Sequence, residues 1–189
     1  SNPQRLEAVV FKARGFRMIQ SYWKSVNIGD QKLRDFFDGD TLAVEEKVDG
    51  SQFSFGKIGG ELHARSRSKA LDLVSPEKLF APAVNYVVSI ADKLPDNLIF
   101  RGECVSSPRH NSLHYSRTPK GFVAIFGAED AVTGEHIQAR DCATLADQLG
   151  FEVVPTLFEF NPGEMNPAEI FEQLRGALAL ESFLGGVLI

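Results

Sequence analysis

Lys47-Val48-Asp49-Gly50 is the stretch whose residue types and spacing best fit a chemical reaction. It follows an apolar run and precedes a Gly59-Gly60 turn, so we expect Lys47 at the end of a strand. A lysine amine held there, with an acid two residues later, is able to attack a phosphorus atom. A free lysine has a pKa of about 10.4, and a nucleophilic lysine needs that pKa lowered by burial or nearby cations. The motif therefore predicts covalent nucleotidyl transfer with Lys47 as the nucleophile.

Cations that would lower the pKa of Lys47 follow on the next predicted hairpin strand. Arg65, Arg67 and Lys69 occur there within five residues. The alternative is a solvated lysine at a strand end, followed by Asp49 and Gly50 as ordinary turn residues. Other motifs must decide between the two.

A second motif, Phe100-Arg101-Gly102-Glu103, ends another predicted strand. A carboxylate at a strand end is able to accept hydrogen bonds from both ribose hydroxyls, and the glycine before Glu103 would let a ligand approach the backbone. The alternative is an ordinary edge glutamate. On a later strand we expect Phe122, Ala124 and Phe126 to share one face, where a phenylalanine stacks on a purine or packs in the core.

The expected elements are hairpins interleaved with a few helices. Helices are predicted over residues 3–13, 75–94 and 141–150 and from 166, and strands over 41–48, 52–58, 61–67, 98–103, 121–128 and 151–158, with a last strand starting at 186. This order favours an α+β fold of antiparallel sheets flanked by helices, as one domain over residues 1–189. Glycine-rich phosphate loops of the G-x-x-x-x-G-K-[ST] and G-x-G-x-x-G types are absent from the sequence, so side chains are expected to hold any phosphates.

Composition limits the class of protein. The net charge of −5 argues against coating of nucleic acid by bulk positive charge, although residues 101–120 hold six basic or histidine side chains against one acid. That segment predicts a basic face or, alternatively, a solvated loop. Cys104 and Cys142 lack metal-type spacing and are expected to be buried and reduced. No run approaches the roughly 20 apolar residues that cross a bilayer, and we expect a cytoplasmic monomer without membrane contact.

Taken in order, the motifs resemble a known family. The segments EKVDGSQFSF, RSRSK, FRGE and SPRHNSLHYSRTPKGFVAIFG are similar to those of ATP-dependent RNA ligases of the phage type, over about residues 45–127. These ligases belong to the covalent nucleotidyltransferase superfamily, shared with DNA ligases and mRNA capping enzymes. The resemblance implies a nucleotidyltransferase fold (an ATP-grasp-like ligase adenylation domain), ATP and Mg²⁺ as cofactors, and a lysine–AMP intermediate. It also implies RNA ends carrying a 5′-phosphate and a 3′-hydroxyl as substrates.

The resemblance also implies roles for the charged residues. Lys47 matches the nucleophile and Glu103 the acid that binds ribose. Arg67 matches an arginine that contacts phosphate or ribose, with Arg65 as the alternative. No residue is assigned to a metal.

The remaining implied roles concern the base and the ends of the substrate. Phe126 matches the aromatic residue under adenine, with Phe122 as second choice. Glu45 and Glu46 match positions that contact the adenine amino group, and Asp49 is expected to orient the lysine or an arginine. Polar residues of the loop after Glu103 are expected to steer phosphates or the RNA end: His110, Asn111, His114, Tyr115, Arg117 and Lys120.

Two departures from the family pattern leave alternatives open. Phe126-Gly127 stands where F-D is usual, and neither E-G-V-V-I-K nor a K-x-K pair follows. The segment 184–189 is either a degenerate motif with Gly185 in place of the acid or, as we favour, the lead-in to that motif, in which case the final motif strands are missing. A DNA ligase, a GTP-using capping enzyme, or a binding module that has lost catalysis are the alternative functions.

Overall fold

The computed structural model describes residues 18–22, 41–161, 163–177 and 180–186. The helix predicted over 3–13 and the strand predicted from 186 fall almost wholly outside these residues. A five-stranded sheet with the order β3-β2-β4-β5-β6 forms the larger part of the fold, antiparallel except for the parallel β5–β6 pair. Its strands are β2 (Ser51–Ile58), β3 (Glu61–Ser66), β4 (Leu98–Cys104), β5 (Val123–Asp130) and β6 (Glu152–Val153).

The predicted β2–β3 hairpin is confirmed. Gly59 and Gly60 form its turn with φ of 59° and 84°, a conformation that costs glycine little. Their backbone N–H groups donate to Asn97 Oδ1 at 3.1 Å and to Asp96 Oδ1 at 2.9 Å. These bonds tie the turn to the start of β4 and fix the register of the sheet.

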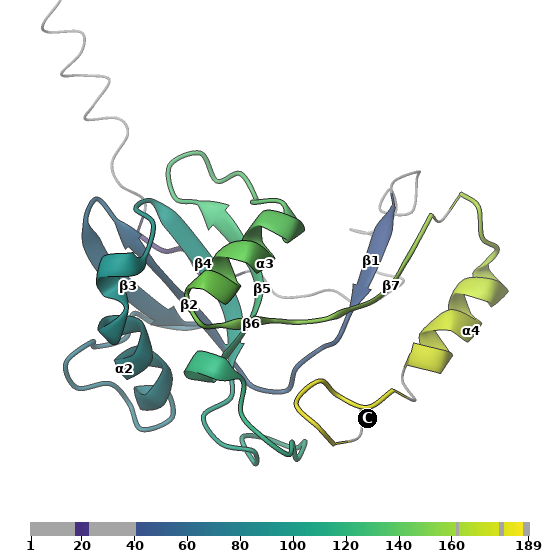
Figure 1. Ribbon diagram of the computed structural model, residues 1–189, viewed down its shortest axis with the longest axis horizontal. Helices are drawn as coiled ribbons and strands as arrows, with labels where there is room; N and C mark the ends of the chain where they lie inside the picture. Colours follow the sequence, from purple (N-terminus) through teal and green to yellow (C-terminus); the bar gives the residue numbers. More distant parts are fainter. Residues whose placement is uncertain (1–17, 23–40, 162, 178–179, 187–189) are drawn as a thin grey trace, which may run out of the picture.

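Two helices, α2 (Ala81–Ser89) and α3 (Ala139–Gln148), cover one face of this sheet and form its main core (Figure 1). Phe53, Phe55 and Phe100 are fully buried there. The short 3-10 helices η2 (Ala91–Lys93) and η3 (Lys120–Phe122) follow α2 and precede β5. The opposite face, called the polar face below, carries Gln52, Ser54, Arg101 and Glu103, together with Ile58 and Ile99 at one end.

The start of α2 differs from the prediction. Ser75-Pro76 was expected to open the helix, but Asp72 Oδ1 accepts hydrogen bonds from the backbone N–H groups of Val74 and Ser75 and closes a turn there. The helix begins only at Ala81. Ser75 therefore belongs to the turn closed by Asp72, and Ser75-Pro76 does not cap the helix.

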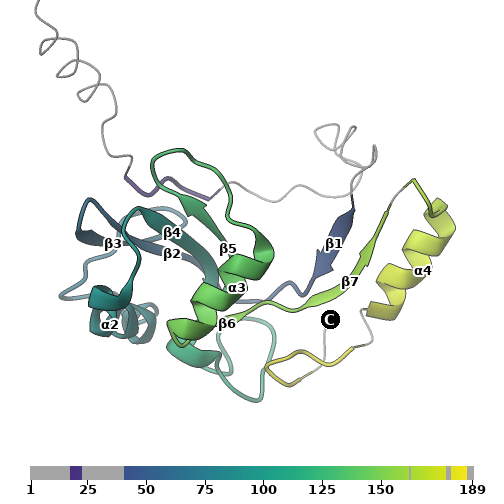
Figure 2. The same cartoon turned by 45° about the horizontal axis from the view of Figure 1, so that its top comes forward.

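A second, two-stranded sheet pairs β1 (Leu42–Glu45) with β7 (Thr156–Phe160), and α4 (Pro167–Ala177) lies beside it (Figure 2). The strand predicted over 151–158 is divided at Val154-Pro155, because β6 joins the large sheet and β7 joins β1. The predicted start of α4 is confirmed, since Asn166 Oδ1 accepts hydrogen bonds from the N–H groups of Ala168 and Glu169. The fold is α+β, as predicted. None of its described helices has the length and apolar character that crossing a bilayer requires.

Candidate active site

Lys47 lies on the segment that links the two sheets, between β1 and β2. The residues on either side of it are buried and held. Val48 packs in a small cluster with Tyr115 and Leu184, and the Glu46 carboxylate accepts hydrogen bonds from Ser182 Oγ at 2.5 Å and from Phe183 N at 3.2 Å. Lys47 itself is exposed. Anchored neighbours thus fix the backbone of a lysine whose side chain faces solvent.

Glu103, at the end of β4, is the residue on which the predicted charged groups converge. Burial raises the pKa of Glu103 to about 7, while the nearby charges of Lys47 and Arg67 act to lower it and Asp49 acts to raise it. The charges of Lys47 and Arg67, which come from separate motifs, thus act on one carboxyl group.

Arg65 and Arg67, the two alternatives for one role, have different surroundings. Arg65 donates from Nη1 to the carbonyl oxygen of Ile19 at 2.7 Å. Arg67 is exposed, and its charge acts on Glu103. Of the two arginines, Arg67 is therefore the one whose charge acts on Glu103, and its predicted contact with phosphate or ribose stays a prediction.

Gln52 was missed by the sequence reasoning. It pairs with Glu103 across β2 and β4, so both side chains lie on the polar face of the sheet. The Gln52 Oε1 atom is buried and accepts no hydrogen bond from the described residues. A ligand hydroxyl or amine beside Glu103 would supply the missing donor. Its alternation with Ser54 on β2 was the one signal available in the sequence.

The glycines of the two motifs are required by packing. A Cβ atom on Gly50 would lie 2.4 Å from the carbonyl oxygen of Cys104 and 2.9 Å from Cγ of Glu103. On Gly102 it would lie 2.5 Å from Val123 Cγ1. Packing against β5 therefore accounts for Gly102, and the expectation that this glycine admits a ligand stays a prediction.

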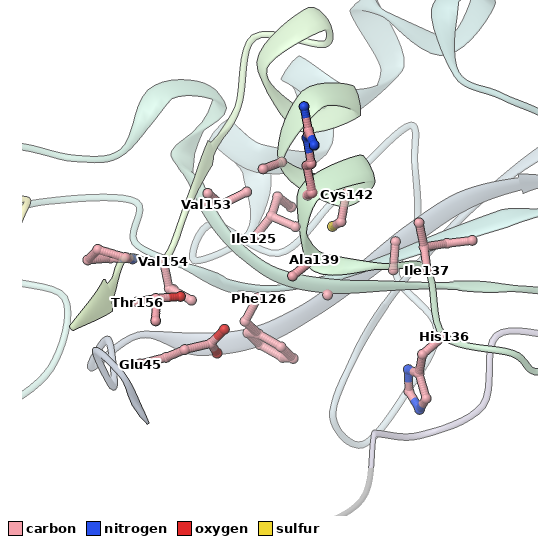
Figure 3. A pocket seen from close by; sticks show the side chains of 15 residues that line it. Glu45, Ile125, Phe126, His136, Ile137, Ala139, Cys142, Val153, Val154 and Thr156 are labelled. Carbon is pink, nitrogen blue, oxygen red and sulfur yellow. The ribbon is translucent and has the colours of Figure 1, made fainter. Parts of the chain in front are cut away.

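A pocket of about 480 Å³, a volume typical of small-molecule sites, lies between β5, α3 and the segment from β6 to β7. In Figure 3, Glu45, Phe126 and His136 lie along one side of it and Cys142 of α3 lies across from them. Burial raises the pKa of Glu45. Phe126 lies two residues after Ala124, the partner of Glu103 on β5, so the pocket and Glu103 share neighbouring positions of β5. Glu45 and Phe126, both predicted at the base, thus line one pocket.

Phe122 does not share a face with Phe126. Gly121 and Phe122 have φ of 64° and 63°, which interrupts the alternation before β5 begins at Val123. Phe122 packs against the main core, whereas Ala124 and Phe126 belong to the cluster around Val48. The shared face predicted for the three residues is wrong for Phe122.

Asp49 holds the loop after Glu103 in place. Its Oδ2 accepts hydrogen bonds from the N–H groups of Ser112 and Leu113, both at 3.0 Å, and its own N–H donates to the Tyr115 hydroxyl at 2.7 Å. Asn111 Nδ2 donates to the Gly50 carbonyl oxygen at 2.6 Å. The structure thus shows that Asp49 anchors this loop; its predicted role in orienting the lysine or an arginine stays a prediction.

Other polar residues of this loop are also engaged with protein groups. His110 Nδ1 accepts a hydrogen bond from Ser106 N at 3.1 Å, which leaves Nε2 to donate to Ser51 Oγ at 2.9 Å. Burial lowers the pKa of His110, consistent with this neutral tautomer. Arg117 forms a bidentate pair with Glu152 at 2.8 and 2.9 Å. His114 and Lys120 are exposed.

The Gly185-Gly186 segment packs tightly against the same loop. Both glycines have positive φ, 76° and 96°, and a Cβ on Gly185 would lie 2.4 Å from Ser116 Oγ. An acidic side chain would be strained and crowded at position 185. This geometry argues against the interpretation in which Gly185 replaces a metal-binding acid.

The family match agrees with the site. A family model for RNA ligases matches residues 40–183, well over half of the chain. The chain belongs to the RNA ligase family. No curated protein sequence matches this family member significantly. Within the described residues, no group of three or more His, Cys, Asp or Glu side chains is arranged to hold a metal ion by itself.

Solved RNA ligases share the fold of this family member. A Naegleria gruberi RNA ligase E227A mutant with ATP and Mn has a TM-score of 0.65 at 14% identity, over 89% of this chain and 50% of that one. The K326A mutant of the same ligase, also with ATP and Mn, has a TM-score of 0.60 at 18% identity, over 83% and 47%. An archaeal ATP-dependent RNA ligase has a TM-score of 0.58 at 16% identity, over 87% and 44%. The chain thus spans about half the length of these ligases.

Proposed function

We propose that this RNA ligase family member binds ATP and forms a covalent lysine–AMP intermediate as the first step of RNA end joining. The Lys47 amine attacks the α-phosphorus of ATP, a phosphoramide bond forms and pyrophosphate leaves. AMP then passes to the 5′-phosphate of an RNA end, and a 3′-hydroxyl displaces AMP to seal the strand. These steps are phosphoryl-type transfers, in which the protein mainly positions groups and neutralises charge.

The observation that carries this proposal is that the charges of Lys47 and Arg67 both act on the carboxyl group of Glu103, while Glu45 and Phe126 line a pocket in the same chain. Adenine would stack on Phe126, the ribose hydroxyls would bond to Glu103, and the phosphates would then extend toward the two cations. The buried, unpartnered Gln52 Oε1 fits a hydroxyl donor at the ribose. Mg²⁺ would enter bound to the phosphate oxygens, as is usual for this ion.

The direct test is the intact mass of the protein after incubation with ATP and Mg²⁺. We expect one added AMP on the parent chain and none on Lys47→Ala, because the phosphoramide bond needs that amine. Lys57→Ala is the matched control, since Lys57 lies on β2 near the hairpin turn and outside the site. It should gain AMP at the parent rate.

The nucleotide that labels the protein and the nucleic acid that it seals distinguish the alternative functions. Label from GTP in place of ATP would point to capping chemistry, and sealing of nicked DNA but not RNA would point to a DNA ligase. Calorimetric binding of ATP without any AMP adduct would favour a nucleotide-binding module. An adduct that persists in Lys47→Ala would contradict the assignment of the nucleophile.

A further inference from the structure

We propose that residues 18–22, here called the strap, position the base-stacking Phe126 through the ring of Tyr22. This inference rests on the proposed function, because it takes Phe126 as the platform for adenine. Tyr22 is a positioning residue in this account, since it acts on the nucleotide through another side chain.

The strap is fixed to the polar face of the large sheet at several points. Ile19 is 4% exposed and packs with Ile58, Ile99 and Ala131. Its carbonyl oxygen accepts a hydrogen bond from Arg65 at 2.7 Å. Along the strap, Ser21 Oγ donates to the carbonyl oxygen of Arg67 at 2.9 Å. The strap therefore crosses the strand that carries the two predicted arginines.

Arg101 holds the strap beneath Tyr22. Its Nη1 donates to the carbonyl oxygen of Gln20 at 2.7 Å and to Ser54 Oγ at 2.9 Å, and its Nη2 pairs with Glu129 at 2.5 Å. Arg101 is buried, so these bonds fix its guanidinium. The guanidinium carbon lies 5.8 Å from the centroid of the Tyr22 ring, within cation–π range. The fixed guanidinium of Arg101 thus positions the ring of Tyr22.

Phe126 needs such support because the strand ladder does not fix it. Arg101 pairs with Gly127 and Gly102 pairs with Ile125, so Phe126 is the extra residue of a β-bulge. A bulge re-aims a side chain, and a bulged residue lacks a cross-strand partner. The Tyr22 and Phe126 ring centroids lie 5.0 Å apart at an interplanar angle of 55°. This contact supplies the packing that the ladder does not.

The charge of Glu45, another residue predicted to contact the base, also acts on Tyr22. Burial raises the pKa of the Tyr22 hydroxyl, the charge of Arg101 acts to lower it, and the charges of Glu129 and Glu45 act to raise it. The direct contact of the strap with the predicted base site is the one between the rings of Tyr22 and Phe126.

The test is a double-mutant cycle on nucleotide affinity, measured by calorimetry with AMP and with ATP plus Mg²⁺. An aromatic contact of this kind corresponds to a roughly two- to tenfold change in affinity. We expect Tyr22→Ala to weaken binding by about that factor and Tyr22→Phe to restore it, because the ring makes the contact. In a Phe126→Ala background, Tyr22→Ala should have no further effect.

Controls separate positioning from loss of folding. Met18→Ala alters a strap residue that is 60% exposed and should leave affinity unchanged. Circular dichroism should show the same folded spectrum for every variant. For labelling with AMP, Tyr22→Ala should raise the ATP concentration at half-maximal rate and leave the maximal rate unchanged.

Each remaining outcome counts against the proposal. Parent-level affinity in Tyr22→Ala, or tighter binding, would show that the strap does not support the platform. A loss that persists in the Phe126→Ala background would show that Tyr22 acts through other groups. If Phe126→Ala itself had no effect, or the parent chain bound neither nucleotide, the proposed function would fail together with this inference. A loss in Phe126→Ala without one in Tyr22→Ala would contradict the strap alone.

Discussion

The two sheets of this RNA ligase family member differ in their number of strands and in how deeply their side chains are buried. The five-stranded sheet has helices on one face and the strap on the other, and its aromatic core is fully buried. The β1–β7 pair has only two strands, and most of its apolar side chains are partly exposed. Two strands alone are marginally stable in water, so the large sheet carries most of the folding energy.

This difference bears on the site. Glu103 and the strand leading to Arg67 belong to the large sheet, whereas Glu45 ends β1 and Lys47 lies on the link between the sheets. Glu103 and Arg67, which are proposed to bind the sugar and the phosphate, therefore lie on the large sheet or directly after one of its strands. Lys47, the proposed nucleophile, lies on the link between the sheets, so its position depends on how the two sheets are held together.

Truncation of one phenylalanine in each sheet should reveal the largest difference in unfolding free energy between the two sheets. Phe55 packs against Phe100 with ring centroids 5.3 Å apart and is fully buried, so Phe55→Ala should lower the free energy of unfolding by about 3–5 kcal/mol. Phe158 on β7 is only partly buried, and Phe158→Ala should cost less than about 2 kcal/mol. Urea unfolding followed by circular dichroism measures both. Equal losses would contradict the comparison.

The next effect concerns Glu103, the partly buried acid near the end of β4 in the large sheet. Because the pKa of Glu103 is about 7 when folded and about 4.3 in an unfolded chain, the folded state holds its proton more tightly. Its contribution to stability is therefore present below pH 4.3 and is lost as the pH rises to 7. Glu103→Gln should raise the free energy of unfolding at pH 8 by up to about 3 kcal/mol and change it little at pH 4. Denaturant titrations across this range test the sign, and a variant less stable at pH 8 would contradict it.

A smaller effect should distinguish a tightly packed glycine of β4 from a glycine of β5 that has open space beside it. Gly102→Ala forces a methyl group to within 2.5 Å of Val123 and should cost about 1–3 kcal/mol of unfolding free energy. Gly127→Ala is the matched control, because nothing lies within 4 Å of the Cβ position there. Thermal melts of both variants measure the difference. A Gly127→Ala variant as unstable as Gly102→Ala would show that the Gly127 position is packed as tightly as the Gly102 position.

Local signals predicted the elements that depend on local chemistry. Gly59-Gly60 predicted the hairpin turn, and Asn166-Pro167 predicted the start of α4, because positive φ and helix capping are short-range requirements. Lys47, Glu103 and Phe126 were predicted from motifs, and the structure brings them to one region. Their chemical roles stay predictions, as does the phage-type relationship.

Features set by tertiary contacts were not predictable. The sequence around Val154-Pro155 reads as one strand, and only pairing with two different sheets divides it. Contacts with residues far away in the chain determine the partners or positions of Gln52, Glu152 and Ser182. Tyr22 carries no sequence signal at all, because its contact with Phe126 exists only when the strap crosses the folded sheet.

The most direct test of the central claim is a crystal structure of the chain with bound AMP. We expect the adenine ring on Phe126, the ribose hydroxyls hydrogen-bonded to Glu103, and the phosphate directed to the Lys47 amine. An AMP molecule bound elsewhere, or bound in this pocket with its ribose turned away from Glu103, would contradict the account.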